Sequence, residues 1–79
     1  MIDSNVMRYI PKKLHSHVIA CDRFKNFENG YTYNVIFDYE PDIKEGETSI
    51  MADGIEGLKW CCKEILNGRR GVIYGWYII

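Results

Sequence analysis

The chain has 79 residues and a formal net charge of −1, and this length predicts one small domain that spans residues 1–79. Its 47% hydrophobic and 27% charged residues are typical of folded proteins and argue against intrinsic disorder. The nearly neutral charge argues against a general attraction to nucleic acids or acidic membranes, and a core of this size argues against a large enzyme cleft.

The most regular stretch is YTYNVIFDYE, residues 31–40, in which the odd positions are apolar and the even positions are mostly polar. This period of two predicts a strand with one buried face and one mostly solvated face. The preceding SHVIACDRF, residues 16–24, is rich in β-forming residues and is expected to be the partner strand. Asn29 and Gly30 between them are typical of a hairpin turn.

A polar segment follows Pro41, and TSIMA, residues 48–52, is expected to form a short third strand. Asp53 is suited to cap a helix, because its carboxylate can accept hydrogen bonds from the free N–H groups of the first turn. A helix is then expected up to the stop signal at Gly68, although two early glycines weaken its first turn. Apolar residues recur in it at helical spacing, at Ile55, Leu58, Cys62 and Ile65.

The last segment, RRGVIYGWYII, ends in eight residues that are apolar except for Gly75. It is expected to be the fourth strand, and a strand that is apolar on both faces usually lies inside its sheet. A helical connection normally places the next strand parallel to the one before the helix. These features predict an α+β fold, with one helix packed on a single sheet of four strands in the order 4-1-2-3.

One helix covers only one face of such a sheet, so the other face of the last strand needs a second cover. That uncovered face consists either of Tyr74, Trp76 and Ile78 or of Ile73, Tyr77 and Ile79. The candidate covers are the N-terminal stretch NVMRYIPKKL, residues 5–14, a second copy of the chain in a homodimer, or a target protein.

Two histidines and three cysteines are the residues best suited to chemistry: His15, His17, Cys21, Cys61 and Cys62. The spacings typical of structural zinc sites do not occur among them. Adjacent residues on a helix diverge by about 100°, and nothing orients a Cys–His nucleophile. We therefore expect the helical cysteines to be core residues and the histidines to be partly exposed strand residues. No catalytic residue, metal ligand or cofactor is predicted.

The charges are unevenly distributed along the chain: residues 38–56, which we call the acidic segment, contain seven acidic residues and one base, Lys44. The simplest interpretation is a solvated loop that keeps the protein soluble. The alternative that we favour is a small non-enzymatic protein-binding module, such as a phage or mobile-element inhibitor of a host factor in a defence or nucleic-acid-processing complex. Its acidic loop and exposed aromatic residues would contact the partner. The residues expected to do so are Tyr39, Glu40, Asp42, Glu45, Glu47 and Trp60.

Trp60 lies at the margin of the apolar stripe of the expected helix. Tryptophan is enriched at the energetic centres of interfaces, but a position at the edge of the core would also explain it.

A nucleic-acid-binding protein is the second alternative. Bases near the N-terminus alternate with Tyr9 and Phe24, so that basic groups could contact phosphates while aromatic rings stack on unpaired bases. The net charge and the acidic segment argue against this alternative. The residues that would form this basic surface are Arg8, Lys12, Lys13, Arg23 and Lys25.

The three cysteines do not form a disulfide framework, because their number is odd and two are adjacent. The N-terminal MIDSNVMRYI lacks the basic and apolar regions of a signal peptide. The apolar run at the C-terminus is far shorter than the ~20 residues of a membrane-spanning helix. We therefore expect a cytoplasmic protein, in the cytosol of the host cell, with no part in a membrane.

Overall fold

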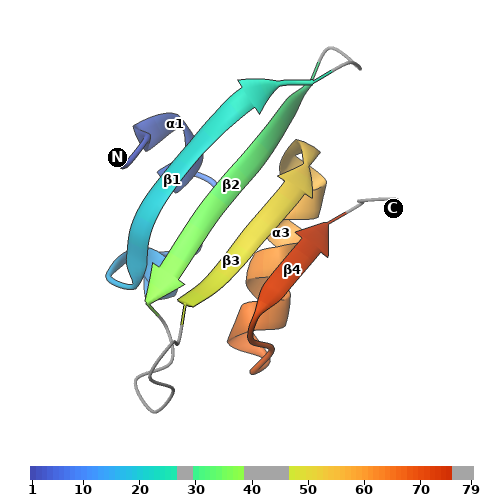
Figure 1. The fold of residues 1–79 in the computed structure, drawn as a ribbon. Helices are drawn as coiled ribbons and strands as arrows, with labels where there is room; N and C mark the ends of the chain where they lie inside the picture. Colours follow the sequence, from blue (N-terminus) through green and yellow to red (C-terminus); the bar gives the residue numbers. More distant parts are fainter. Residues whose placement is uncertain (27–29, 39–46, 76–79) are drawn as a thin grey trace.

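The computed structural model describes residues 1–26, 30–38 and 47–75, and these form an α+β fold (Figure 1). The predicted order of three strands, a helix and a fourth strand is confirmed, and two short helices precede the first strand. The elements are α1 (Ser4–Met7), α2 (Lys12–His15), β1 (Val18–Lys25), β2 (Tyr31–Asp38), β3 (Glu47–Asp53), α3 (Gly54–Leu66) and β4 (Val72–Gly75).

The four strands form one mixed sheet in the order β1-β2-β3-β4. β1 and β3 are both antiparallel to β2, and β4 is parallel to β3, as expected for a strand that follows a helical connection. The hairpin between β1 and β2 is therefore confirmed, although residues 27–29 of its turn lie outside the described residues.

The predicted strand order 4-1-2-3 is wrong, because β4 lies beside β3 at the edge of the sheet rather than beside β1. The outer edge of β1 is already occupied by the N-terminus, where Ile2 forms a parallel bridge with Cys21. The backbone N–H of Cys21 donates to the carbonyl oxygen of Met1 at 3.0 Å, and that of Asp3 donates to the carbonyl oxygen of Cys21 at 3.2 Å. These contacts close the edge that β4 was expected to occupy.

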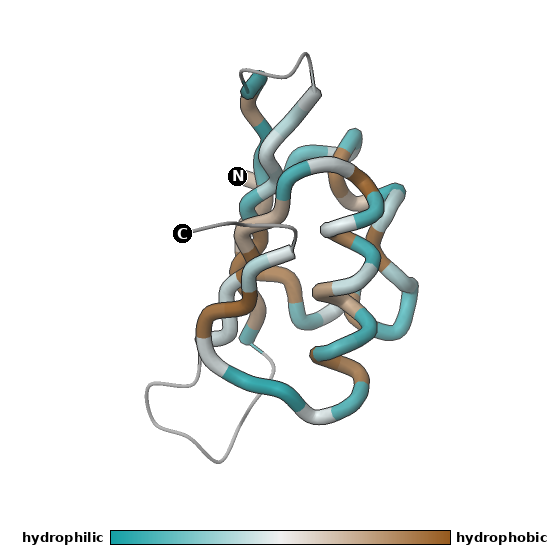
Figure 2. Tube along the Cα trace, turned by 90° about the vertical axis from the view of Figure 1, so that its right-hand side faces the viewer, coloured by the Kyte–Doolittle hydropathy of each residue, from teal (hydrophilic) through white to brown (hydrophobic). Residues whose placement is uncertain are grey.

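The hydrophobic core lies on one face of the sheet, between the strands and all three helices (Figures 1 and 2). Residues 5–14 were one candidate for covering the opposite face, but they pack on the same side as α3. Val6, Ile10 and Leu14 are buried there together with Leu58 and Ile65 of α3. The N-terminal segment therefore extends the helical layer across β1, and no helix of the described residues lies on the other face of the sheet.

α3 begins directly after Asp53, as expected, but the carboxylate of Asp53 makes no capping hydrogen bond to the helix. The Thr32 hydroxyl instead donates to Asp53 Oδ1 at 2.7 Å, across the paired strands β2 and β3. Gly54 follows with a φ of 81°, a left-handed conformation that glycine adopts without steric cost. The turn from β3 into α3 thus depends on a glycine and a cross-strand hydrogen bond instead of a side-chain cap.

None of the helices in the described part of the chain is long and apolar enough to cross a membrane.

Candidate protein-binding face

The face of the sheet opposite the helices, which we call the open face, is the candidate functional site. Figure 2 shows the helices on one side of the sheet, and no described helix lies on the other side. Successive side chains of a strand point to opposite faces, so the pairing register identifies the members of this face. They are Ala20, Asp22 and Phe24 of β1; Thr32, Asn34, Ile36 and Asp38 of β2; Ser49, Met51 and Asp53 of β3; and Val72 and Tyr74 of β4.

A bulge in β1 sets which of its residues reach the open face. Val18 is paired with Phe37 and Ala20 with Ile36, so the register shifts by one residue at Ile19. In a regular strand Val18 and Ala20 would share one face, because they are two positions apart. The bulge therefore turns Val18 toward the core and Ala20 toward the open face.

The open face exposes large apolar side chains at both edges of the sheet. Phe24 is 53% exposed on β1, whereas Val72 and Tyr74 are 57% and 40% exposed on β4. Between them, Ile36 and Met51 are partly buried. Antiparallel sheets commonly leave one face to water, but that face is then mainly polar. Apolar groups across the whole width of a face are more typical of a contact surface.

Three of the residues assigned above to the open face are charged, and all three are acidic: Asp22, Asp38 and Asp53. The bases of β1, Arg23 and Lys25, occupy the alternate positions, which belong to the helical side. Acidic and basic residues are mixed along the sequence, but the alternation of side chains in the strands places the acidic ones on the open face and the bases of β1 on the other. The open face is therefore negatively charged.

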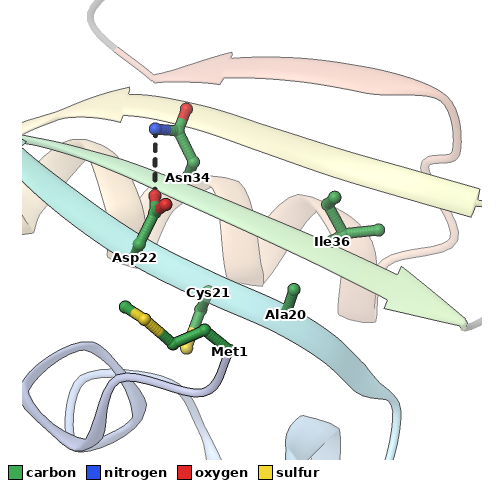
Figure 3. Close-up of a pocket in the computed structure, with 6 residues that line it drawn as sticks. All are labelled: Met1, Ala20, Cys21, Asp22, Asn34 and Ile36. Carbon is green, nitrogen blue, oxygen red and sulfur yellow. Dashed lines mark hydrogen bonds between the residues drawn. The ribbon is translucent and has the colours of Figure 1, made fainter.

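A shallow hollow lies on the open face along β1 and β2 (Figure 3). Asp22 and Asn34 stand at one end of it, where Asn34 Nδ2 donates to Asp22 Oδ1 at 3.3 Å. Its other lining residues are Met1, Ala20, Cys21 and Ile36. The N-terminal pairing with β1 thus brings the side chain of Met1 to the border of the open face.

The residues predicted to bind a protein partner are only partly placed by the structure. Tyr39, Glu40, Asp42 and Glu45 lie outside the described residues. Glu47 is the first residue of β3 and is paired with Asp38, at the end of β2.

Trp60 is exposed, with 36% of its surface accessible. It belongs to α3, which covers the opposite side of the sheet (Figure 1). Trp60 and the open face are therefore separate surfaces.

Two of the predicted nucleic-acid-binding residues flank a cluster of tyrosines. The Arg23 guanidinium lies 4.1 Å from the ring centroid of Tyr31, and that of Arg8 lies 5.4 Å from the ring centroid of Tyr9. Both rings contact Tyr33, at centroid distances of 6.3 and 6.4 Å. Each arginine thus already stacks on a tyrosine of its own chain.

The other members of the predicted basic surface are distributed over two elements. Lys12 and Lys13 are exposed on α2, and Lys25 is exposed at the end of β1. Phe24, which was expected to lie among these bases, points to the open face instead. The structure therefore separates this aromatic residue from the bases beside it in the sequence.

The cysteines of α3 are core residues, as predicted. Cys61 and Cys62 are fully buried, and this burial raises the pKa of the Cys61 thiol to about 11 and that of Cys62 to about 12. Burial also raises the pKa of Cys21. Neutral, inaccessible thiols are poor nucleophiles and poor metal ligands. Among the described residues there is no group of three or more histidine, cysteine or carboxylate side chains that could hold a metal ion.

The histidines were expected on a strand, and this prediction is wrong. His15 ends α2, which follows Pro11, and His17 precedes β1. His15 Nε2 lies 2.7 Å from the carbonyl oxygen of Ile10, and His17 Nδ1 lies 3.1 Å from that of Asp38. Proline is well tolerated where a helix begins, and the resulting helical turn removes both rings from the strand.

Sequence reasoning predicted that one face of the last strand would need a cover, but it did not extend this prediction to the other strands of the open face. The alternation in residues 31–40 indicated which positions of β2 are solvated, but β4 is apolar at every described position except Gly75. Only the buried state of Ile73 and the exposed state of Tyr74 decide which face of β4 is covered. No protein-family model, curated protein or solved structure matches this chain, so any functional assignment rests on the geometry of the chain itself.

Proposed function

We propose that this protein is a small binding module that attaches to another protein through the open face of its sheet. The observation that carries the proposal is the exposure of Phe24, Val72 and Tyr74 on a sheet face that no described helix covers. A sheet normally buries an apolar face against a second layer. A partner protein would supply that layer, and the module would act by occupying the surface of its target, as an inhibitor of a host factor does.

The apolar side chains alone do not supply enough free energy for a tight complex. Burying a large apolar side chain completely contributes ~1.5–3 kcal/mol, and these three are already about half buried, so covering them adds roughly 2–4 kcal/mol. A micromolar complex needs about 8 kcal/mol. Charged and polar groups around the apolar residues must therefore contribute, together with residues beyond the open face.

The acidic segment adjoins the open face and can supply part of this charged contribution to binding. Its first part, residues 39–46, connects β2 to β3, and the flanking residues Asp38 and Glu47 are paired at one end of the open face. Glu40, Asp42 and Glu45 follow within this segment. Clustered charges chiefly raise the rate of association with a partner of opposite sign. We therefore assign attraction of the target to this segment and retention of the target to the open face.

The test compares two pairs of exposed apolar residues on opposite sides of the molecule. The open-face variant carries Phe24→Ser and Tyr74→Ser, and the control variant carries Trp60→Ser and Leu66→Ser on α3. Circular dichroism first establishes that both remain folded. Proteins cross-linked to each variant in cells are then quantified by mass spectrometry against the unmodified chain.

A specific partner that the control variant retains and the open-face variant loses would support the proposal. Loss from the control variant alone would contradict it, because the working surface would then be α3 with Trp60 as its anchor.

One observation favours nucleic acid as a second candidate partner, namely the position of Arg8 and Arg23 around one tyrosine cluster. Binding of single-stranded DNA or RNA should then weaken steeply with salt. It should also weaken when Lys12, Lys13 and Lys25 are changed to glutamine. A lack of binding at low ionic strength would eliminate this candidate.

A further inference from the structure

We infer that the partner segment on the open face is basic and amphipathic, with lysine or arginine residues interleaved with apolar residues, and that it is not a second copy of this chain. This inference rests on the proposed function and identifies the chemistry of the partner.

The side chains of the open face lie in rows across the sheet, and the register gives their order. The first row is Phe24, Thr32 and Asp53; the second is Asp22, Asn34, Met51 and Tyr74; the third is Ala20, Ile36, Ser49 and Val72. Asp38 begins a fourth row. Neighbouring rows are about 7 Å apart along the strands. Each carboxylate therefore has an apolar neighbour in the adjacent row of its own strand: Phe24 beside Asp22, Met51 beside Asp53 and Ile36 beside Asp38. A matching partner must interleave basic and apolar groups at similar spacing.

Two of the three carboxylates on the open face are held in position by neighbouring side chains. Asp22 accepts a hydrogen bond from Asn34, and Asp53 accepts one from Thr32. Each acid keeps acceptor capacity after one such bond, because an ionised carboxylate has about four lone-pair sites. Fixed acceptors beside exposed apolar side chains favour a partner that brings N–H donors with positive charge.

A face-to-face homodimer brings carboxylates against carboxylates. In a two-fold interface the same patch is contributed by both copies, and the positions assigned to the open face include no lysine or arginine to compensate. Like charges juxtaposed in an interface are strongly unfavourable, and in a homodimer this repulsion opposes the gain from covering the exposed apolar groups of both copies. With a basic partner the carboxylates are attracted instead of repelled, and the exposed apolar side chains are still covered.

The experiment uses the full chain and two synthetic peptides. One is a short peptide in which lysine alternates with leucine, and the other has the same sequence with glutamate in place of lysine. Backbone amide chemical shifts of the labelled protein are followed at low ionic strength during each titration. We expect the lysine peptide to perturb amides of the rows around Asp22, Met51 and Tyr74, with binding that weakens as salt is added. The glutamate peptide should produce no such perturbation.

A matched pair of charge reversals tests the face itself. Asp22→Lys with Asp38→Lys should weaken binding of the lysine peptide about tenfold or more, equivalent to about 1.4 kcal/mol. Glu56→Lys with Glu64→Lys makes the same change of net charge on α3 and should leave binding within about twofold. Equal losses in both variants would overturn the inference, because they would show a response to net charge rather than to the open face.

Two further outcomes separate this inference from the proposed function. If the lysine peptide fails to bind while a cellular partner is still lost from the Phe24→Ser, Tyr74→Ser variant, the basic chemistry is wrong and the binding face stands. If the lysine peptide perturbs only the helical side, both are wrong. Analytical ultracentrifugation of the unmodified chain completes the test, since an open-face dimer at the titration concentration would contradict the exclusion of a second copy.

Discussion

Gly75 of β4 lies directly against Gly57 of α3, and both residues are buried. A Cβ atom placed on Gly75 would come within 2.7 Å of the carbonyl carbon of Gly57 and 2.8 Å of Cys61 Sγ. Two glycines thus allow the backbone of the helix to approach the backbone of the last strand. This contact explains why the apolar C-terminal run is interrupted at residue 75, and why α3 tolerates a glycine that weakens its first turn.

The contact predicts that Gly75→Ala destabilises the fold strongly. The new methyl group meets backbone atoms, which cannot move aside as a flexible side chain would, and overpacking of this kind costs typically ~1–3 kcal/mol. Gly30→Ala is the control, because a Cβ there meets nothing closer than Asn26 Oδ1 at 3.6 Å. Urea unfolding of both variants measures the difference, and equal midpoints would show that α3 and β4 are not in close contact.

Helices α1 and α2 should be part of the cooperative core, although each has only four residues. Leu14 is fully buried, whereas Leu66 at the end of α3 is 40% exposed. Leu14→Ala should therefore lower the free energy of unfolding by about 2–5 kcal/mol. The same substitution at Leu66 should lower it by no more than about 1 kcal/mol. Thermal unfolding followed by circular dichroism checks both values, and a negligible effect at Leu14 would mean that the N-terminal segment is not docked.

The stability of the fold should decline at alkaline pH because of the buried thiols. The pKa of Cys61 rises from 9.0 to about 11 and that of Cys62 to about 12, so the folded chain retains protons that the unfolded chain releases. The stabilisation that they provide is fully present below pH 9 and is lost as the pH rises toward 11 and 12. Urea midpoints measured from pH 7 to pH 10.5 should therefore fall above pH 9.

Cys62→Ala isolates the contribution of one thiol from that of other groups that titrate in this range. The variant should be less stable at pH 7, because it loses a buried side chain, but its midpoint should fall less steeply above pH 9. Parallel pH profiles for the variant and the unmodified chain would show that the thiol does not titrate differently in the two states.

The acidic segment and Trp60 give a kinetic prediction for the complex with the target. Reversal of Glu40, Asp42, Glu45 and Glu47 to lysine should slow association and flatten its dependence on salt, with the melting temperature nearly unchanged. Because retention of the target is assigned to the open face, Phe24→Ala should instead accelerate dissociation, and Trp60→Ala would do so only if α3 were the working surface. Surface plasmon resonance with the isolated target measures both rates. The prediction would be contradicted if binding stayed intact after the charge reversal but was lost when Lys12, Lys13 and Lys25 were neutralised. The basic surface would then be the part of the protein that contacts the target.

Local patterns in the sequence determined the elements of this fold. The alternation in residues 31–40 predicted β2 and its covered face, and the helical spacing of Leu58, Cys62 and Ile65 predicted α3 and its buried stripe. These predictions were confirmed because side-chain direction follows backbone geometry within a single element. The parallel direction of β4 was predictable for a similar reason, since a helical connection limits how the chain returns to the sheet.

The tertiary structure decided the strand order, the positions of the short helices and the identity of the open face. β4 is apolar on both sides, so its sequence did not distinguish an interior strand from an edge strand. Two contacts between distant segments place β4 beside β3. Ile2 occupies the outer edge of β1, and Gly75 of β4 fits against Gly57 of α3. Asp53 is a smaller example. Its carboxylate was expected to cap α3, but it accepts a hydrogen bond from the Thr32 hydroxyl on the neighbouring strand instead. Such contacts depend on which surfaces meet after the chain has folded, and no periodicity within one segment encodes them.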